Sequence, residues 1–153
     1  RQMCIRDSYY GDLTERQFRN IFKKASNIKG DTSQILIELL ERRLDATVYR
    51  MKFVPTIFSA RQLVNHGHVK VNGKRVNIPS YSVSDGDEIS IRDKSKEINL
   101  IVESVSSQER EIPEYLEVDV KELKGRFLRA PLIHDVPYPV TMEPNLVIEY
   151  YSR

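Results

Sequence analysis

The chain has 153 residues, of which 40% are hydrophobic and 30% are charged, and it contains no tryptophan. This length allows one moderate hydrophobic core or two small ones, so a large catalytic domain has no room beside another unit. No apolar run approaches the roughly 18 residues that a membrane span requires. The single cysteine, Cys4, excludes an intramolecular disulfide and a multi-cysteine metal cluster. We therefore expect a globular, cytoplasmic protein with no cofactor and no metal site.

The net charge is only +2, but the charged residues are distributed unevenly. Residues 1–30 carry 7 basic and 3 acidic side chains, residues 42–92 carry 9 and 4, and residues 93–123 carry 4 and 9. Phosphate contacts dominate the affinity of proteins for nucleic acids. A polyanion is therefore expected to contact the first two blocks and to avoid the third. On charge alone, a solvated mixed-charge surface explains the pattern equally well.

The first predicted element is a basic amphipathic helix from Leu13 to Lys29, which ends before Gly30. Its apolar residues recur about one turn apart, with basic residues between them. Phe18 and Phe22 have the spacing of core residues rather than of side chains that stack on bases.

A second and longer helix is predicted from residue 31 or 32 to Met51, ending before Pro55. Its apolar stripe consists of Ile37, Leu40, Leu44, Val48 and Met51. Three arginines, Arg42, Arg43 and Arg50, lie off this stripe, so we expect them on the exposed side of the helix.

A third helix is predicted between an N-cap at Thr56 and a stop at Gly67. At about 100° per residue, its apolar residues form one arc and leave Arg61, Gln62 and Asn65 on the other. The polar side of this short helix is therefore free to bind a partner.

The sequence VKVNGKRV follows, with alternating apolar residues around Asn72-Gly73, the strongest short signal for a β-hairpin. A second tight turn is predicted at Asp85-Gly86. Residues 42–92 are thus interpreted as two short helices on a small antiparallel sheet.

Residues 93–123 allow no firm assignment, since Lys96–Glu109 fits helix or strand. Four prolines between Ala130 and Pro144 predict an extended tail that packs back over the other elements. The last eight residues have the composition of a final strand. The predicted fold class is α+β, with a helical region at 1–41, a module at 42–105 and a C-terminal region at 106–153.

The string SARQLVNHGHVKVNGKRVNIP, from Ser59 to Pro79, and the following YSVSDGDEISIR closely resemble a small RNA-binding module. That module is first known from bacterial small-subunit ribosomal protein number four. The flanks YYGDLTERQFRNIFKKA, LLERRLDATVYRMKF, PEYLEVD and LVIEYYSR also resemble this ribosomal protein family. The resemblance therefore extends over nearly everything after Ser8.

The resemblance implies primary binding to the five-prime domain of small-subunit ribosomal RNA, nucleation of subunit assembly and an effect on translational accuracy. It also implies contact with small-subunit ribosomal protein number five and repression of the protein's own messenger RNA. Family members have a basic N-terminal stretch, sometimes with a four-cysteine zinc knuckle, whereas only Cys4 precedes Tyr9 here. We expect that stretch to be missing, residues 1–8 to be foreign, and zinc to be absent.

One positive ridge is predicted from the third helix and the hairpin, and further contacts from the first two helices. Two tyrosines outside the periodic pattern are predicted to stack on bases. The residues predicted to contact RNA are Tyr9, Tyr10, Arg16, Arg19, Lys23, Arg42, Arg43, Arg50, Arg61, Gln62, Asn65, His68, Lys70, Asn72, Lys74 and Arg75. With separated basic and acidic blocks, the chain is expected to be a monomer outside the ribosome.

Two other functions fit parts of the sequence. RRLDATVYR resembles the catalytic motif of pseudouridine synthases, in which Asp45 would be the nucleophile, but here the motif precedes the module and no catalytic domain follows. We expect Asp45 to pair with Arg42 or Arg43 on an exposed helix instead. The other alternative is a stand-alone ribosome-associated factor, which would not need the matching flanks.

His66 and His68 flank Gly67, but they lack a third nearby ligand and form only a weak candidate for a metal site.

Overall fold

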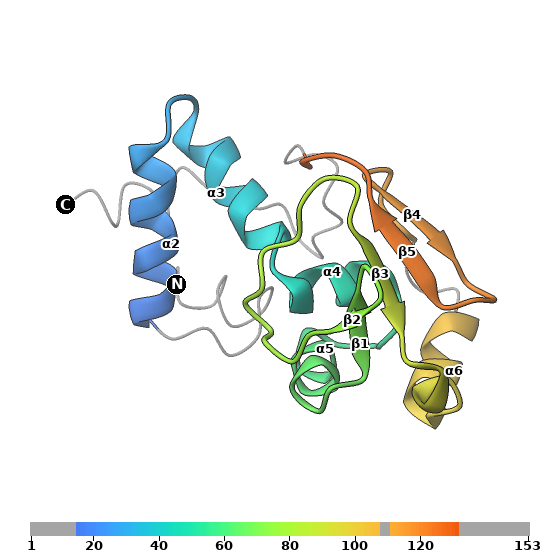
Figure 1. The fold of residues 1–153 in the computed structure, drawn as a ribbon. Coiled ribbons are helices and arrows are strands. Elements are labelled where there is room, and N and C mark those ends of the chain that lie inside the picture. Colours follow the sequence, from blue (N-terminus) through green and yellow to red (C-terminus); the bar gives the residue numbers. More distant parts are fainter. Residues whose placement is uncertain (1–14, 108–110, 132–153) are drawn as a thin grey trace. The chain divides into compact units, whose positions relative to one another are not determined.

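The structure is a computed structural model that describes residues 15–107 and 111–131 (Figure 1). The described residues fall into two compact units. One contains the residues up to Glu41 together with Pro131, and the other runs from Arg42 to Ala130.

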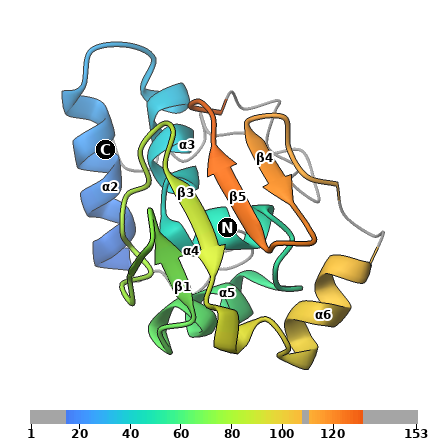
Figure 2. The same cartoon turned by 45° about the vertical axis from the view of Figure 1, so that its right-hand side comes forward.

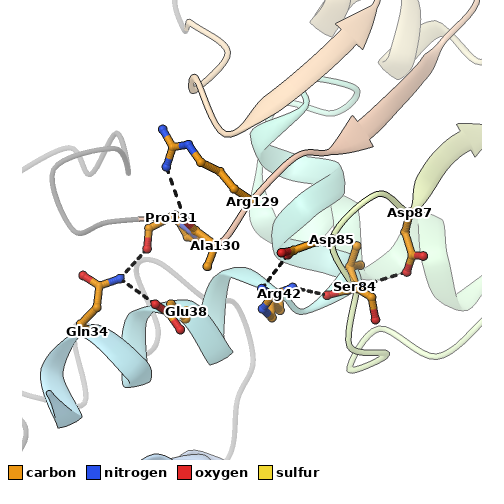
Figure 3. A network of polar contacts seen from close by, with 10 residues as sticks. Gln34, Glu38, Arg42, Ser84, Asp85, Asp87, Arg129, Ala130 and Pro131 are labelled. Atoms are coloured by element: carbon orange, nitrogen blue, oxygen red, sulfur yellow. Dashed lines mark hydrogen bonds and ion pairs between the residues drawn. The ribbon is translucent and has the colours of Figure 1, made fainter. Parts of the chain in front are cut away.

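The first unit contains helices α2 (Glu15–Asn27) and α3 (Thr32–Glu41), joined through Gly30 (Figure 1). Gly30 has a φ of 130°, which favours glycine at this turn. Phe18 and Phe22 are buried, which confirms their assignment to the core. The Gln34 amide donates hydrogen bonds to the Glu38 carboxylate and to the Pro131 carbonyl, at 3.2 and 2.6 Å (Figure 3).

The single long helix predicted up to Met51 is wrong, because the chain forms a second helix, α4 (Leu44–Arg50), after a break. Arg43 is extended at the break, with φ −61° and ψ 139°, and forms an antiparallel β-bridge with Ser82. The Leu44 amide donates to the Tyr81 carbonyl at 2.9 Å. A distant segment thus satisfies the first backbone donor of α4, which helical periodicity cannot reveal.

The second unit packs α4 and α5 (Ile57–Asn65) on one antiparallel sheet (Figures 1 and 2). The strands are β1 (Val69–Val71), β2 (Lys74–Arg75), β3 (Glu88–Ile91), β4 (Leu116–Asp119) and β5 (Lys124–Phe127). They lie in the order β2-β1-β3-β5-β4 and every pair is antiparallel. The predicted α+β fold is confirmed, with two helices and a hairpin at the expected positions.

Local signals account for this part of the fold. The Thr56 hydroxyl accepts a hydrogen bond from the Ser59 amide at 3.0 Å, so Thr56 is the N-cap of α5 as predicted. Asn72 and Gly73 have φ values of 52° and 82°, as the two central residues of a type I′ hairpin turn require. The apolar arc of α5 and alternate residues of β1 and β3 are buried in the core between helices and sheet.

The region without a firm assignment contains a short 3-10 helix, η1 (Asp93–Ser95), helix α6 (Asn99–Ser106) and strand β4, and β5 follows directly after it. β5 pairs with β3, which extends the sheet of the module. The predicted extended tail lies outside the described residues except for its first two, and so does the predicted final strand. No helix in the described part of the chain is long and apolar enough to cross a membrane.

Candidate nucleic-acid interface

The polar side of α5 lies at the surface. Gln62 and Asn65 are exposed and Arg61 is partly buried, while the apolar arc faces the core. The Arg61 Nη1 atom is buried and has no hydrogen-bond partner within the described residues. The Arg61 side chain is thus partly enclosed, and its guanidinium is only partly satisfied by the described residues.

The hairpin supplies the other half of the predicted ridge. Lys74 and Arg75 are exposed on β2, which is an edge strand, and Lys70 is partly buried on β1. Gly67 lies between the helix and the hairpin. The Arg75 Nη2 atom is so close to it that a Cβ added at position 67 would lie only 2.5 Å from that atom. The Arg75 guanidinium thus lies over the end of α5. We call the exposed side of α5 and this hairpin, with Arg61, Gln62, Asn65, His68, Lys70, Lys74 and Arg75, the basic ridge.

Asn72 has a structural role at the hairpin turn. Its amide donates to an Asp87 carboxylate oxygen at 3.0 Å, and its carbonyl accepts from the Glu88 amide at 3.0 Å. Asp87 also accepts from the Ser84 amide at 2.9 Å, which fixes the second predicted turn (Figure 3). The polar atoms of Asn72 are therefore already used within the module, so its side chain braces the ridge.

The arginines at the start of the module are not on a solvated helix face. Arg43 and Arg50 are each only 5% exposed, and Asp45 is 1% exposed. Arg43 donates two hydrogen bonds to the Asp45 carboxylate, at 3.0 and 3.2 Å. The predicted pairing of Asp45 is thus confirmed for Arg43, whereas the expected exposure of this pair is wrong. Burial raises the pKa of the Asp45 carboxyl, and the attraction and hydrogen bonds of Arg43 lower it.

Arg42 is held by a different set of contacts. Its guanidinium donates to Asp85 at 2.7 Å (Figure 3) and to the Val83 carbonyl at 2.9 Å. It also lies 5.0 Å from the centre of the Phe127 ring. Its hydrogen bonds thus fix the loop that precedes β3, and Asp85 already neutralises its charge.

The basic residues of α2 belong to the first unit. Arg16, Arg19 and Lys23 are exposed, as the predicted amphipathic helix requires. Tyr9 and Tyr10 lie outside the described residues. The structure thus provides a second basic surface on α2, separate in sequence from the basic ridge.

His68 is better connected than its sequence position suggests. Its Nδ1 atom shares a hydrogen bond of 2.6 Å with the Ser95 hydroxyl, and its carbonyl accepts from the Arg92 amide at 2.9 Å. Burial lowers the pKa of His68, and the nearby bases His66, Arg92 and Arg75 lower it further. The sequence reasoning missed Arg92 and Ser95. The sequence signal that could have indicated Arg92 was its position directly after a strand predicted to lie next to the hairpin.

The acidic residues of β4 lie at the other edge of the sheet. The strand order places β2, with Lys74 and Arg75, at one edge and β4, with Glu117 and Asp119, at the opposite edge. The two edges of the module therefore carry opposite charge.

Within the described residues, no group of three His, Cys, Asp or Glu side chains could hold a metal ion.

Comparison with known proteins adds to this geometry. Residues 42–89 match the model of the S4 domain, so the match covers α4, α5, β1, β2 and the first half of β3. The chain is 63% identical over 145 residues to small ribosomal subunit protein uS4 of Ruegeria sp. (strain TM1040), covering 95% of this chain and 70% of that one. It is 61% identical over the same length to the proteins of that name from Paracoccus denitrificans and Gluconacetobacter diazotrophicus, covering 70% and 71% of them. An S4 domain together with matching flanks on both sides shows that the chain belongs to the family of small ribosomal subunit protein uS4.

Proposed function

We propose that this chain is a structural, RNA-binding constituent of the small ribosomal subunit in the cytoplasm, and that it binds small-subunit ribosomal RNA through the basic ridge. Membership of the uS4 family supports the ribosomal role. The matching S4 domain contains Arg61 and the hairpin. Membership of the family thus supports the function, and the geometry of the module supports the location of the interface.

The observation that carries the location of the interface is the lack of ion pairs on the basic ridge within the described residues. Within the described residues, Arg61, Lys70, Lys74 and Arg75 make no ion pair, whereas Arg42 and Arg43 each do. Binding to phosphate therefore breaks no internal ion pair at the ridge. Counterions on these cations are released to solvent when RNA binds, which favours association.

The finer parts of the proposal follow from the resemblance to the family. They are primary binding to the five-prime domain, nucleation of assembly, an effect on translational accuracy, contact with small-subunit ribosomal protein number five, and binding to the chain's own messenger RNA. The opposite charges of the two sheet edges support a model in which RNA contacts one edge and a basic protein the other. We further propose that the free chain is a monomer, which sedimentation at low micromolar concentration would test.

We propose no catalytic activity for the module. A nucleophile must reach its substrate, whereas the Asp45 carboxylate is buried and holds Arg43 with two hydrogen bonds. Purified chain should therefore not isomerise uridine in ribosomal RNA. Isomerisation that disappears in Asp45→Asn would overturn this proposal and favour the pseudouridine synthase alternative. A stand-alone factor is disfavoured because the similarity extends over both flanks of the module.

The test of the proposed function is crosslinking in cells, followed by sequencing of the RNA attached to the chain. We expect recovery of the five-prime domain of small-subunit ribosomal RNA, with crosslinked peptides from α5 and the hairpin. Recovery of large-subunit RNA alone would overturn the proposal and favour the stand-alone factor. Peptides from α2 alone would keep the ribosomal role but move the interface to the first unit.

A further inference from the structure

Basic side chains gather where α5 ends and β1 begins. His66 is the C-cap of α5 and His68 precedes β1, and their rings meet edge to face with centres 6.3 Å apart. The Arg75 guanidinium lies over Gly67, the residue between them. Arg92 follows β3, and its amide is hydrogen-bonded to the His68 carbonyl. We call His66, His68, Arg75 and Arg92 the histidine cluster.

The charge of this cluster is not neutralised from within the module. The charged groups that act on His68 are His66 from α5, Arg75 from β2 and Arg92 after β3, and all are bases. From η1, Ser95 contributes a neutral hydroxyl, while Asp93 is paired with Lys96 at 3.1 Å. In the described part of the chain, neither Arg75 nor Arg92 makes an ion pair.

Resting on the proposed function, we propose that the histidine cluster binds a phosphodiester of the RNA backbone and takes up a proton from solvent when it does so. The hydrogen bond to Ser95 uses Nδ1 of His68 and leaves Nε2 for a ligand. In the neutral tautomer that carries its proton on Nε2, Nδ1 accepts from the Ser95 hydroxyl and Nε2–H donates. In the charged ring both nitrogens donate. Nε2 can therefore donate to a phosphate oxygen in both states, and the charged state binds more strongly.

Proton uptake follows from how the surroundings of His68 change. In the free chain, burial and the neighbouring bases lower its pKa from the ordinary 6.5, which favours the neutral ring. A phosphate anion placed among these bases offsets their repulsion and raises the pKa. The affinity for RNA should therefore increase as the pH falls, by about tenfold for each unit by which binding raises the pKa.

The folding stability of the free chain should respond to pH in the opposite direction. A histidine whose pKa is lowered by folding contributes stability that is present above its unfolded pKa and lost as the pH falls through its folded pKa. If low pH only destabilised the fold, RNA binding would weaken as the pH falls. Stronger binding under conditions that reduce stability would therefore identify protonation in the complex.

The experiment measures binding of the whole chain to a five-prime-domain RNA fragment between pH 7.5 and 5.5 at constant salt. In parallel, NMR follows the His66 and His68 rings with and without this RNA. For the parent we expect the pKa of His68 to rise on binding and the affinity to increase by about tenfold over this range. His68→Gln should lose most of that increase. Lys74→Ala is the matched control: it should weaken binding at every pH and keep the increase, because it removes a phosphate contact and leaves the histidine cluster intact.

Two outcomes overturn the inference in distinguishable ways. A parent that binds the RNA with one affinity across the range, with an unchanged His68 pKa, would overturn proton uptake and leave the proposed function intact. A parent that does not bind the fragment at any pH would overturn both. The NMR measurement needs no variant, so a misfolded His68→Gln would not prevent the test.

Discussion

The same module contains basic residues in two different environments. Arg43, directly before α4, and Arg50, the last residue of α4, are buried, and Arg43 is paired with a buried carboxylate. On the hairpin, Lys74 and Arg75 are exposed and, within the described residues, make no ion pair. One set of cations stabilises the fold and the other is available to a polyanion. Burial and the presence of a partner, rather than the number of charges, decide which function a basic residue has.

This difference arises from the backbone. The extended conformation of Arg43 and its bridge to Ser82 bring the start of α4 into contact with the loop that precedes β3. A charged side chain enclosed there requires a partner, and Asp45 supplies it two residues later. The hairpin turn at Asn72-Gly73 instead directs β2 to the edge of the sheet, where its side chains stay in water.

The largest expected effect comes from removing the charge of the buried pair. Asp45→Asn leaves the Arg43 guanidinium buried without a counter-charge, so the free energy of unfolding should fall by about 3 to 5 kcal/mol. Chemical denaturation followed by circular dichroism would measure this. Where the variant is folded, its affinity for RNA should be nearly that of the parent, because Asp45 lies below the surface.

Asp85→Asn is the matched control for this prediction. Asp85 also pairs with an arginine, Arg42, at 2.7 Å, but 59% of its side chain is exposed, against 2% for Asp45. The loss for this exposed pair should be only about 0 to 1 kcal/mol. Equal losses for the two variants would contradict the distinction between a buried and an exposed pair.

Local signals were sufficient to predict much of the module. The alternation around Asn72-Gly73, the cap at Thr56 and the apolar arc of α5 each depend on residues within one or two turns. For the same reason, the exposed positions of Gln62, Lys74 and Arg75 could be predicted before the structure was known.

The remaining features depend on contacts between distant residues. The break before α4 is fixed by Ser82 and Tyr81, about 40 positions away, so an apolar stripe that continues through it conceals the break. β5 contains a glycine and two charged residues, and it becomes a strand by pairing with β3 rather than through its own propensity. Arg92 joins the histidine cluster only because β3 lies beside β1.

The second largest effect is expected at Arg61, where a cation of the basic ridge is partly enclosed. Arg61→Ala should weaken RNA binding by about 1 to 3 kcal/mol, because the guanidinium can make paired hydrogen bonds. Arg61→Lys should restore only part of the loss, since an ammonium cannot reproduce the planar fork. Filter binding at several salt concentrations would measure both, and complete rescue by lysine would show that Arg61 acts as a point charge.

A smaller effect is expected at Lys74, which is fully on the surface of the hairpin. Losing one phosphate contact should reduce the slope of log affinity against log salt by about 0.7 to 0.9. Lys74→Ala should show this change at almost unaltered stability, because no described contact holds the side chain. If Lys74→Ala and Arg61→Ala both match the parent in affinity and slope, the basic ridge is not the RNA surface. The basic side of α2 then becomes the better candidate.

The smallest effect is expected at the acidic edge, where Glu117 is exposed on β4 opposite Arg126 of β5. Removing an anion far from the contact changes only the long-range field, which salt screens over about 8 Å at physiological ionic strength. Glu117→Ala, and likewise Glu114→Ala, should therefore leave the affinity for the five-prime-domain fragment unchanged or raise it slightly, most visibly at low salt. The same salt titration measures this, with circular dichroism to confirm that each variant is folded. A loss of affinity comparable to that of Lys74→Ala would mean that RNA contacts the acidic edge directly, and the assignment of the two sheet edges to different partners would fail.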